Sequence, residues 1–159
     1  METEPITVNG VKKLQDELND LINNKRQKVI QAIAVAREHG DLKENAEYHA
    51  AKEEQGHIEG RIQEIQSLLA NVEIIDVSKI PDGTKTVVFG ATVQVSDLDN
   101  NTKIKFQIVG DDEADIEQGL LSYKSPVAKS LISKEKGDFA TAITPKGEKN
   151  YEIIKITYE

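Results

Sequence analysis

The chain has 159 residues, of which 38% are hydrophobic and 30% are charged, a composition typical of a globular protein with one ordinary domain or two small ones. Its 20 Lys and Arg against 28 Asp and Glu give a formal net charge of -8, so the surface as a whole repels nucleic acids and anionic membranes. The absence of cysteine excludes a disulfide framework, a thiol nucleophile and a cysteine zinc site. Because neither a signal-like N-terminus nor a membrane-spanning apolar run occurs, we expect a cytoplasmic protein without membrane contact.

The first half of the chain has the apolar spacing of two helices. Steps of three and four residues connect most members of the first stripe, which are Val11, Leu14, Leu18, Leu21, Val29, Ile33 and Ala36. The second stripe is narrow enough for a coiled-coil seam and consists of Ala51, Ile58, Ile62, Ile65, Leu69 and Val72. Gly40, between them, suits the left-handed conformation that ends many helices. The pattern predicts an antiparallel helical hairpin, an arm of roughly 43 Å if the first helix runs from Val11 to His39.

The second half, from residue 77 onward, has the alternation of strands and the residues of turns. We expect strands within residues 86–96, 103–109, 139–144 and 151–158, with turns at residues 99–101 and 145–147. Ser125 followed by Pro126 is typical of a helix start, which predicts a short helix over residues 127–132. The whole chain is therefore predicted to be α+β, with an antiparallel coiled-coil hairpin at residues 1–76 and a mostly antiparallel sheet domain at residues 77–159.

The turn between the two predicted helices carries two carboxylates, Asp41 and Glu44. Mg²⁺ accepts one or two protein carboxylates and completes its octahedron with water or phosphate, so this pair could supply part of such a site. The same spacing fits a capping box, in which Asp41 caps the second helix and Glu44 reaches back to its amide. Spacing alone favours the cap, whereas the apolar Leu42 between the two acids has no capping role.

Two basic residues, Arg37 and Lys52, lie at similar heights on the two predicted helices. Their axial offset would be about 6 Å, so both could meet one phosphate chain. The alternative is that they pair with acids such as Glu38 or Glu53, or remain in solvent.

Four acids follow the strand that ends at residue 109, namely Asp111, Asp112, Glu113 and Asp115. They lack the spacing of an EF-hand calcium loop. We therefore expect a solvated acidic loop, or one that docks on a basic surface.

The segment EHGDLKENAEYHAAKEEQ at residues 38–55 resembles the tip signature of the GreA/GreB family of bacterial transcript cleavage factors. Further similarity occurs in FGATV at residues 89–93, IVGDDEAD at residues 108–115 and SPVA at residues 125–128, and it extends from Thr7 to Tyr158. The resemblance implies an N-terminal antiparallel coiled coil and a C-terminal domain like that of FK506-binding proteins. It also implies that the C-terminal domain binds bacterial RNA polymerase at its secondary channel, while the coiled coil reaches inward to the active centre.

The resemblance further implies roles for individual residues. Asp41 and Glu44 would be the catalytic and metal-binding pair, holding Mg²⁺ jointly with the polymerase active site, whereas the free protein would hold none. The polymerase would hydrolyse the 3′ end of backtracked nascent RNA, so the chain would be a monomeric stimulating factor and not itself an enzyme. Arg37 and Lys52 would contact that RNA end. Docking on the polymerase is expected at Asp111, Asp112, Glu113, Ser122, Ser125 and Pro126.

Other functions fit parts of the sequence. A secondary-channel regulator or inhibitor without cleavage activity would use the same arm but would not need the tip acids, and in a plain coiled-coil scaffold tip substitutions would be silent. A peptidyl-prolyl isomerase or chaperone would need an aromatic-lined pocket. The chain has no Trp, and we expect Phe89, Phe106 and Phe139 in the core, which disfavours that alternative.

Overall fold

The structure is a computed structural model that describes residues 3–81 and 83–158. Contacts divide the described residues into two compact units, one formed by residues 12–71 and the other by residues 3–11 together with residues 72–81 and 83–158. In the described part of the chain, no helix is both long and apolar enough to cross a membrane. The sequence predicted two domains, at residues 1–76 and residues 77–159. That each of these segments folds on its own stays a prediction.

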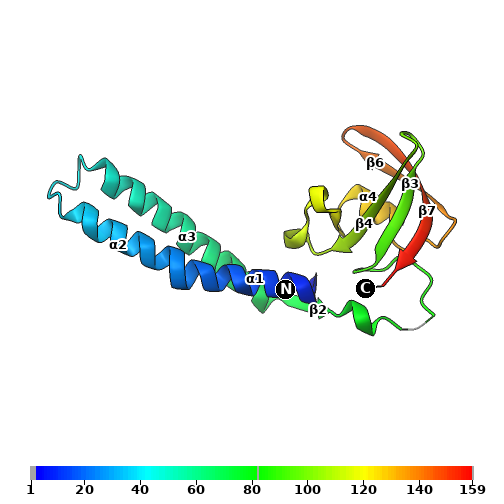
Figure 1. Ribbon diagram of the computed structural model, residues 1–159, viewed down its shortest axis with the longest axis horizontal. Coiled ribbons are helices and arrows are strands. Elements are labelled where there is room, and N and C mark those ends of the chain that lie inside the picture. Colours follow the sequence, from blue (N-terminus) through cyan, green and yellow to red (C-terminus); the bar gives the residue numbers. More distant parts are fainter. Residues whose placement is uncertain (1–2, 82, 159) are drawn as a thin grey trace. The chain divides into compact units, whose positions relative to one another are not determined.

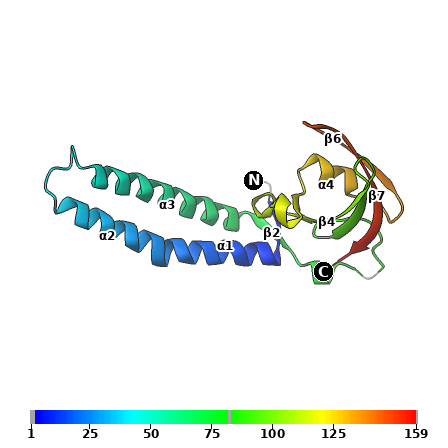
Figure 2. The same cartoon turned by 45° about the horizontal axis from the view of Figure 1, so that its top comes forward.

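Two antiparallel helical segments form the first unit (Figures 1 and 2). The first segment consists of α1 (Val8–Asp20), a π-helical turn (Leu21–Lys25) and α2 (Arg26–Arg37). The second is α3 (Ala46–Ala70), whose 25 residues correspond to about 37 Å. The predicted hairpin is confirmed, although its first helix starts at residue 8 instead of 11 and ends at residue 37 instead of 39.

The apolar seam of the arm depends on the π-helical turn. Its buried side chains are Leu14, Leu21, Val29 and Ala36 on the first segment and Ala51, Ile58, Ile62 and Ile65 on the second. Along the first segment, the buried residues recur every seven positions except at the π turn, where one extra residue lies between Leu21 and Val29. Without that extra residue, Lys28 would occupy the seam position that Val29 fills. The π turn therefore keeps the seam apolar over both α1 and α2.

Two bidentate ion pairs join the helices beside the seam. Arg26 donates from Nε and Nη2 to the two carboxylate oxygens of Glu59, at 2.7 and 2.8 Å. Arg61 donates in the same way to Glu17, at 2.7 and 2.9 Å. These hydrogen bonds hold the pKa values of Glu17 and Glu59 below their ordinary value of 4.5.

We expect the arm to lose stability in acid because of these pairs. A carboxylate whose folded pKa is depressed stabilises the fold above its unfolded pKa, and this contribution is lost as the pH falls through the folded pKa. The melting temperature of the helical circular dichroism signal should therefore decline as the pH falls below about 4.5. Glu59→Gln removes one of the titrating partners and should flatten the decline. An identical decline in this variant would show that the pair contributes nothing to the acid response.

The second unit contains a five-stranded sheet with the order β5-β4-β3-β7-β6 (Figure 1). Its strands are β3 (Thr92–Asp97), β4 (Thr102–Val109), β5 (Leu120–Ser122), β6 (Phe139–Thr144) and β7 (Gly147–Thr157). All neighbours are antiparallel except β4 and β5. The short helix α4 (Pro126–Leu131) is capped by Ser125, whose hydroxyl accepts the Ala128 N–H at 3.2 Å. The predicted α+β class, with a mostly antiparallel sheet and a short helix, is confirmed.

The core of this unit lies between the sheet and α4. Its fully buried large side chains are Val87, Val93, Val95, Ile108, Leu131 and Ile153. Phe106 belongs to this core and Phe89 packs against it, but Phe139 is 64% exposed, so its predicted core position is wrong. On the edge strand β6, alternation turns the small Ala140 and Ala142 inward and leaves Phe139 on the opposite face.

A second, two-stranded sheet was not predicted. The strands β1 (Glu4–Thr7) and β2 (Val72–Ile75) pair in parallel. β1 leads directly into α1, and β2 follows α3 after a single residue. Both ends of the arm therefore start from one small sheet, which the contacts assign to the second unit.

Candidate functional site

The loop of residues 38–45 connects α2 to α3 at the tip of the arm (Figure 2). Gly40 adopts a φ of +92°, in the left-handed region that glycine enters without steric cost. Its N–H donates to the Arg37 carbonyl at 3.1 Å, and the Asp41 N–H donates to the His39 carbonyl at 3.3 Å. Gly40 thus adopts the left-handed conformation that the sequence predicted, and the chain reverses direction within residues 38–45.

The helix cap at this tip is Asn45 and not Asp41. The Asn45 Oδ1 accepts the Tyr48 N–H at 3.0 Å, which caps α3. Its Nδ2 donates to the Ala36 carbonyl at 2.6 Å, so the same side chain also hydrogen-bonds the last turn of α2. The alternative capping box of Asp41 and Glu44 is wrong, because α3 starts beyond both acids.

Asp41 and Glu44 are both exposed and line one open hollow at the tip, together with His39, Asn45, Ala46 and Glu47. The Asp41 Oδ1 accepts the Lys43 N–H at 3.0 Å, and the second carboxylate oxygen has no hydrogen-bond partner among the described residues. Within residues 3–81 and 83–158, the Glu44 carboxylate forms no hydrogen bond or ion pair. The two acids therefore present carboxylate oxygens that the fold does not use.

Two histidines beside this pair of acids contact residues at the tip. The His39 Nε2 lies 3.2 Å from the Glu47 Oε2, and the His49 Nε2 lies 2.9 Å from the Lys43 carbonyl oxygen. Among the described residues, no three metal-ligating side chains gather at one point. Asp41 and Glu44 alone can contribute part of an octahedral ligand set, and other ligands must come from elsewhere.

The basic pair flanks this loop. Arg37 is the last residue of α2 and is exposed. The Lys52 Nζ donates to the Gln55 Oε1 at 3.2 Å. In the part of the chain that the structure describes, neither cation pairs with Glu38 or Glu53, so both charges remain available at the surface of the arm.

The predicted docking residues lie in two segments of the second unit, residues 111–113 and residues 122–126, and a hydrogen bond links these segments. The Ser122 Oγ donates to the Asp111 Oδ1 at 2.9 Å, with Asp112 exposed beside it. Ser125 is half-buried as the cap of α4, and Pro126 is exposed at its first position. These residues can therefore form one surface.

Glu113 differs from the other docking candidates because it is half-buried and its carboxylate is occupied. It accepts hydrogen bonds from the Thr7 N–H at 3.3 Å, from the Thr7 hydroxyl, and from the Gly110 N–H at 2.7 Å. Its side chain is thus engaged within the chain.

Two family models match most of the chain. "Transcription elongation factor, N-terminal" matches residues 4–74, and "Transcription elongation factor, GreA/GreB, C-term" matches residues 82–158. The chain belongs to the GreA/GreB family. Two similar relatives, both named transcription elongation factor GreA, come from Thioalkalivibrio sulfidiphilus, 56% identical over 99% of both chains, and Halorhodospira halophila, 54% identical over 100% of both. A crystal structure of GreA factor homolog 1 from Thermus thermophilus is 24% identical, covers 99% of both chains and has a TM-score of 0.43.

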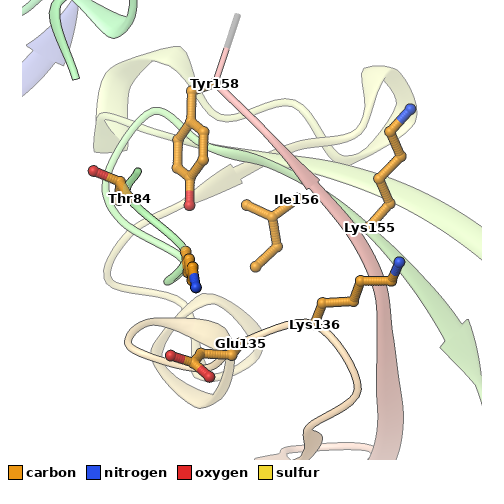
Figure 3. A pocket seen from close by; sticks show the side chains of 7 residues that line it. Thr84, Glu135, Lys136, Lys155, Ile156 and Tyr158 are labelled. Atoms are coloured by element: carbon orange, nitrogen blue, oxygen red, sulfur yellow. The ribbon is translucent and has the colours of Figure 1, made fainter. Parts of the chain in front are cut away.

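A second hollow in this GreA/GreB family member lies beside β7 (Figure 3). It is lined by Thr84, Lys85, Glu135, Lys136, Lys155, Ile156 and Tyr158. Tyr158 contributes the aromatic ring of this lining, and its hydroxyl donates to the Thr86 carbonyl at 2.5 Å. Polar and charged side chains make up most of the remainder. The hollow therefore differs from the aromatic-lined pocket that a prolyl isomerase would require.

Sequence reasoning missed Asn45, the residue that shapes the tip of this GreA/GreB family member. Asn is among the preferred cap residues, so a signal was present. The helix cap was instead assigned to Asp41, because Glu44 follows it at capping-box spacing. The contact that decides between them, from Asn45 to Ala36, crosses from one helix to the other.

Proposed function

We propose that this GreA/GreB family protein binds bacterial RNA polymerase in the cytoplasm and stimulates Mg²⁺-dependent cleavage of backtracked nascent RNA. The observation that carries the proposal is the pair of exposed acids, Asp41 and Glu44, at the tip of a long helical arm. Family membership supports the polymerase as the partner. In this proposal the polymerase is the enzyme and the chain completes its active site.

The acids suit a shared metal site. A bound Mg²⁺ ion supplies Lewis-acid stabilisation of the phosphoryl oxygens and lowers the pKa of its bound water. Asp41 and Glu44 would hold this ion together with carboxylates of the polymerase, since a pair of protein carboxylates is a typical share of a Mg²⁺ ligand set. The cap formed by Asn45 supports this role, because it holds the loop without using either acid.

The docking surface of the proposal consists of Asp111, Asp112, Ser122, Ser125 and Pro126. The hydrogen bond between Ser122 and Asp111 supports a single surface, since it links the two segments that carry these residues. Exposed acids there would favour a basic patch on the polymerase.

Arg37 and Lys52 would hold the displaced RNA end. Their charge reversal, Arg37→Glu with Lys52→Glu, should lower cleavage by about tenfold in deeply backtracked complexes, because each lost phosphate contact removes salt-sensitive attraction. Cleavage by the variant should also depend less on salt. The matched control is Lys12→Glu with Lys28→Glu, which changes the same total charge elsewhere on the arm and should cleave normally. If both variants behave alike, the effect is one of net charge and the assigned contact is wrong.

The test of the proposed function is RNA shortening in a stalled, backtracked elongation complex supplied with Mg²⁺ and the full chain. We expect the added protein to accelerate release of the RNA 3′ fragment. Binding without any acceleration, with several related bacterial polymerases, would overturn the proposal in favour of a secondary-channel regulator.

A further inference from the structure

The tip loop of the arm is held by two side chains from the start of α3, and both bind backbone carbonyl groups. Asn45 donates from Nδ2 to the Ala36 carbonyl oxygen at 2.6 Å, so it links the start of α3 to the last turn of α2. His49 lies one turn further along α3, and its Nε2 is 2.9 Å from the Lys43 carbonyl oxygen inside the loop. All four residues belong to the helical unit.

The chemistry of each contact fixes which atom donates. Asn45 uses the two ends of its amide separately, since Oδ1 accepts the Tyr48 N–H at 3.0 Å while Nδ2 donates across to α2. A carbonyl oxygen only accepts, so the His49 Nε2 carries the hydrogen in its contact with Lys43. A short side chain with both a donor and an acceptor is needed at position 45, because Ser or Asp there could cap α3 but could not donate to the Ala36 carbonyl.

The two tip acids lie within the segment that these contacts hold. The Lys43 N–H donates to the Asp41 Oδ1 at 3.0 Å, and the carbonyl group of the same residue accepts from His49. Glu44 is the residue between Lys43 and Asn45 in the chain. Loss of either contact would therefore release the backbone that carries both carboxylates.

We propose that Asn45 and His49 are positioning residues for the shared Mg²⁺ site. By holding the loop from α3, they keep Asp41 and Glu44 at the spacing that a metal ion held jointly with the polymerase requires. A metal ligand must be placed to within about 0.5 Å, and groups that orient ligands typically contribute about 10- to 100-fold to metal affinity or activity. The inference rests on the proposed function and deepens it.

Asn45→Ser tests the hydrogen bond between the helices, because serine can cap α3 but is too short to reach the Ala36 carbonyl. The cleavage rate at saturating protein should fall by at least about tenfold, and the Mg²⁺ concentration for half-maximal cleavage should rise by at least about threefold. The protein concentration for half-maximal cleavage should stay within about threefold of wild type, because the proposed docking residues lie in the other unit.

The matched control is Asn71→Ser at the other end of α3. The Asn71 Nδ2 donates to the Ser67 carbonyl at 2.9 Å, so this change removes the same kind of hydrogen bond from the same unit. It should leave all three quantities unchanged. His49→Phe keeps a ring beside Tyr48 but removes the donor, and it should also lower the saturating rate, whereas His57→Phe at an exposed position of α3 should not.

A spectroscopic test requires no polymerase. Because the chain contains no cysteine, a single spin label can be attached at Lys43→Cys in the full chain. The electron paramagnetic resonance spectrum should show a more mobile label in the presence of Asn45→Ser, because the loop loses its link to α2, and Asn71→Ser should leave the spectrum unchanged. Asn45→Asp keeps the cap and loses the same donor, so it serves as the folded variant if circular dichroism shows that Asn45→Ser is unfolded.

Two results would overturn the inference. One is a saturating rate and a Mg²⁺ requirement in Asn45→Ser and Asn45→Asp equal to those of Asn71→Ser, which would make Asn45 a helix cap without a role in cleavage. The other is a label as immobile in these variants as in the chain with Asn45. Substitution of Asp41 and Glu44 distinguishes the two levels of the argument: if cleavage needs these acids but not Asn45, only this inference fails, and if it does not need the acids, the proposed function fails.

Discussion

Replacing Asp41 by Asn and Glu44 by Gln together should reduce stimulated RNA cleavage to less than about 1% of the wild-type rate. The amides keep the size of the side chains but remove the negative charge that a hard cation requires from its ligands. Polymerase binding should stay within a few-fold of wild type, because the proposed docking residues belong to the other unit. The measurement is RNA shortening in backtracked complexes, combined with competition for polymerase against the labelled wild-type chain.

The structure explains why this variant should remain folded. Neither acid caps a helix, and the hydrogen bond that the Asp41 side chain accepts from the Lys43 N–H can be accepted equally by the carbonyl oxygen of Asn. Glu47→Gln is the matched control, since it removes a third acid of the same hollow that faces His39. Normal cleavage by the double variant would show that the tip acids are not metal ligands. Equal loss in the control would show that total tip charge, and not the acid pair, sets the rate.

Shortening the arm by one heptad in each helix should abolish stimulated cleavage even though both tip acids are intact. Removing residues 14–20 and 62–68 withdraws the tip by about 10.5 Å, and a metal ligand placed that far away cannot complete the site. Helical content per residue and competition for polymerase should largely survive. A folded and bound shortened variant that cleaves at the normal rate would refute delivery of the acids by the arm.

The choice of deleted residues follows from the seam. Deleting residues 14–20 places Leu21 where Leu14 was, and deleting residues 62–68 places Leu69 where Ile62 was, so apolar positions are kept. A deletion of residues 18–24 would instead bring Lys28 into the position of Leu21, because the π turn adds one residue to the repeat. That second deletion is a useful contrast, since it should unfold the arm instead of only shortening it.

Local patterns were enough to predict much of this fold. The helical hairpin follows from apolar spacing within each helix and from Gly40 between them, both of which act over a few residues. The strands β3, β4, β6 and β7 and the capped helix α4 follow in the same way from alternation and from Ser125 before Pro126. The short strand β1 left no comparable signal, because it forms only when the distant β2 pairs with it.

The candidate tip residues were also predictable, because Asp41, Glu44, Arg37 and Lys52 all lie within one short stretch around the turn. Their local sequence could not decide between a helix cap and exposed acids. That choice depends on the contact of Asn45 with the end of α2, which exists only once the two helices lie side by side. The tertiary structure thus decided that Asp41 is an exposed acid and not a helix cap.

The role of Glu113 shows the same division most clearly. From the sequence alone it is one of four acids in a loop, equivalent to Asp111 and Asp112. In the folded chain it lies beside Thr7, 106 residues earlier, and its carboxylate turns inward to bind that residue. Composition and short-range spacing determined the helices, the strands and the set of charged candidates, because those depend on neighbouring residues. Which charges remain available to a partner depends on contacts between distant segments, and only the tertiary structure decided that.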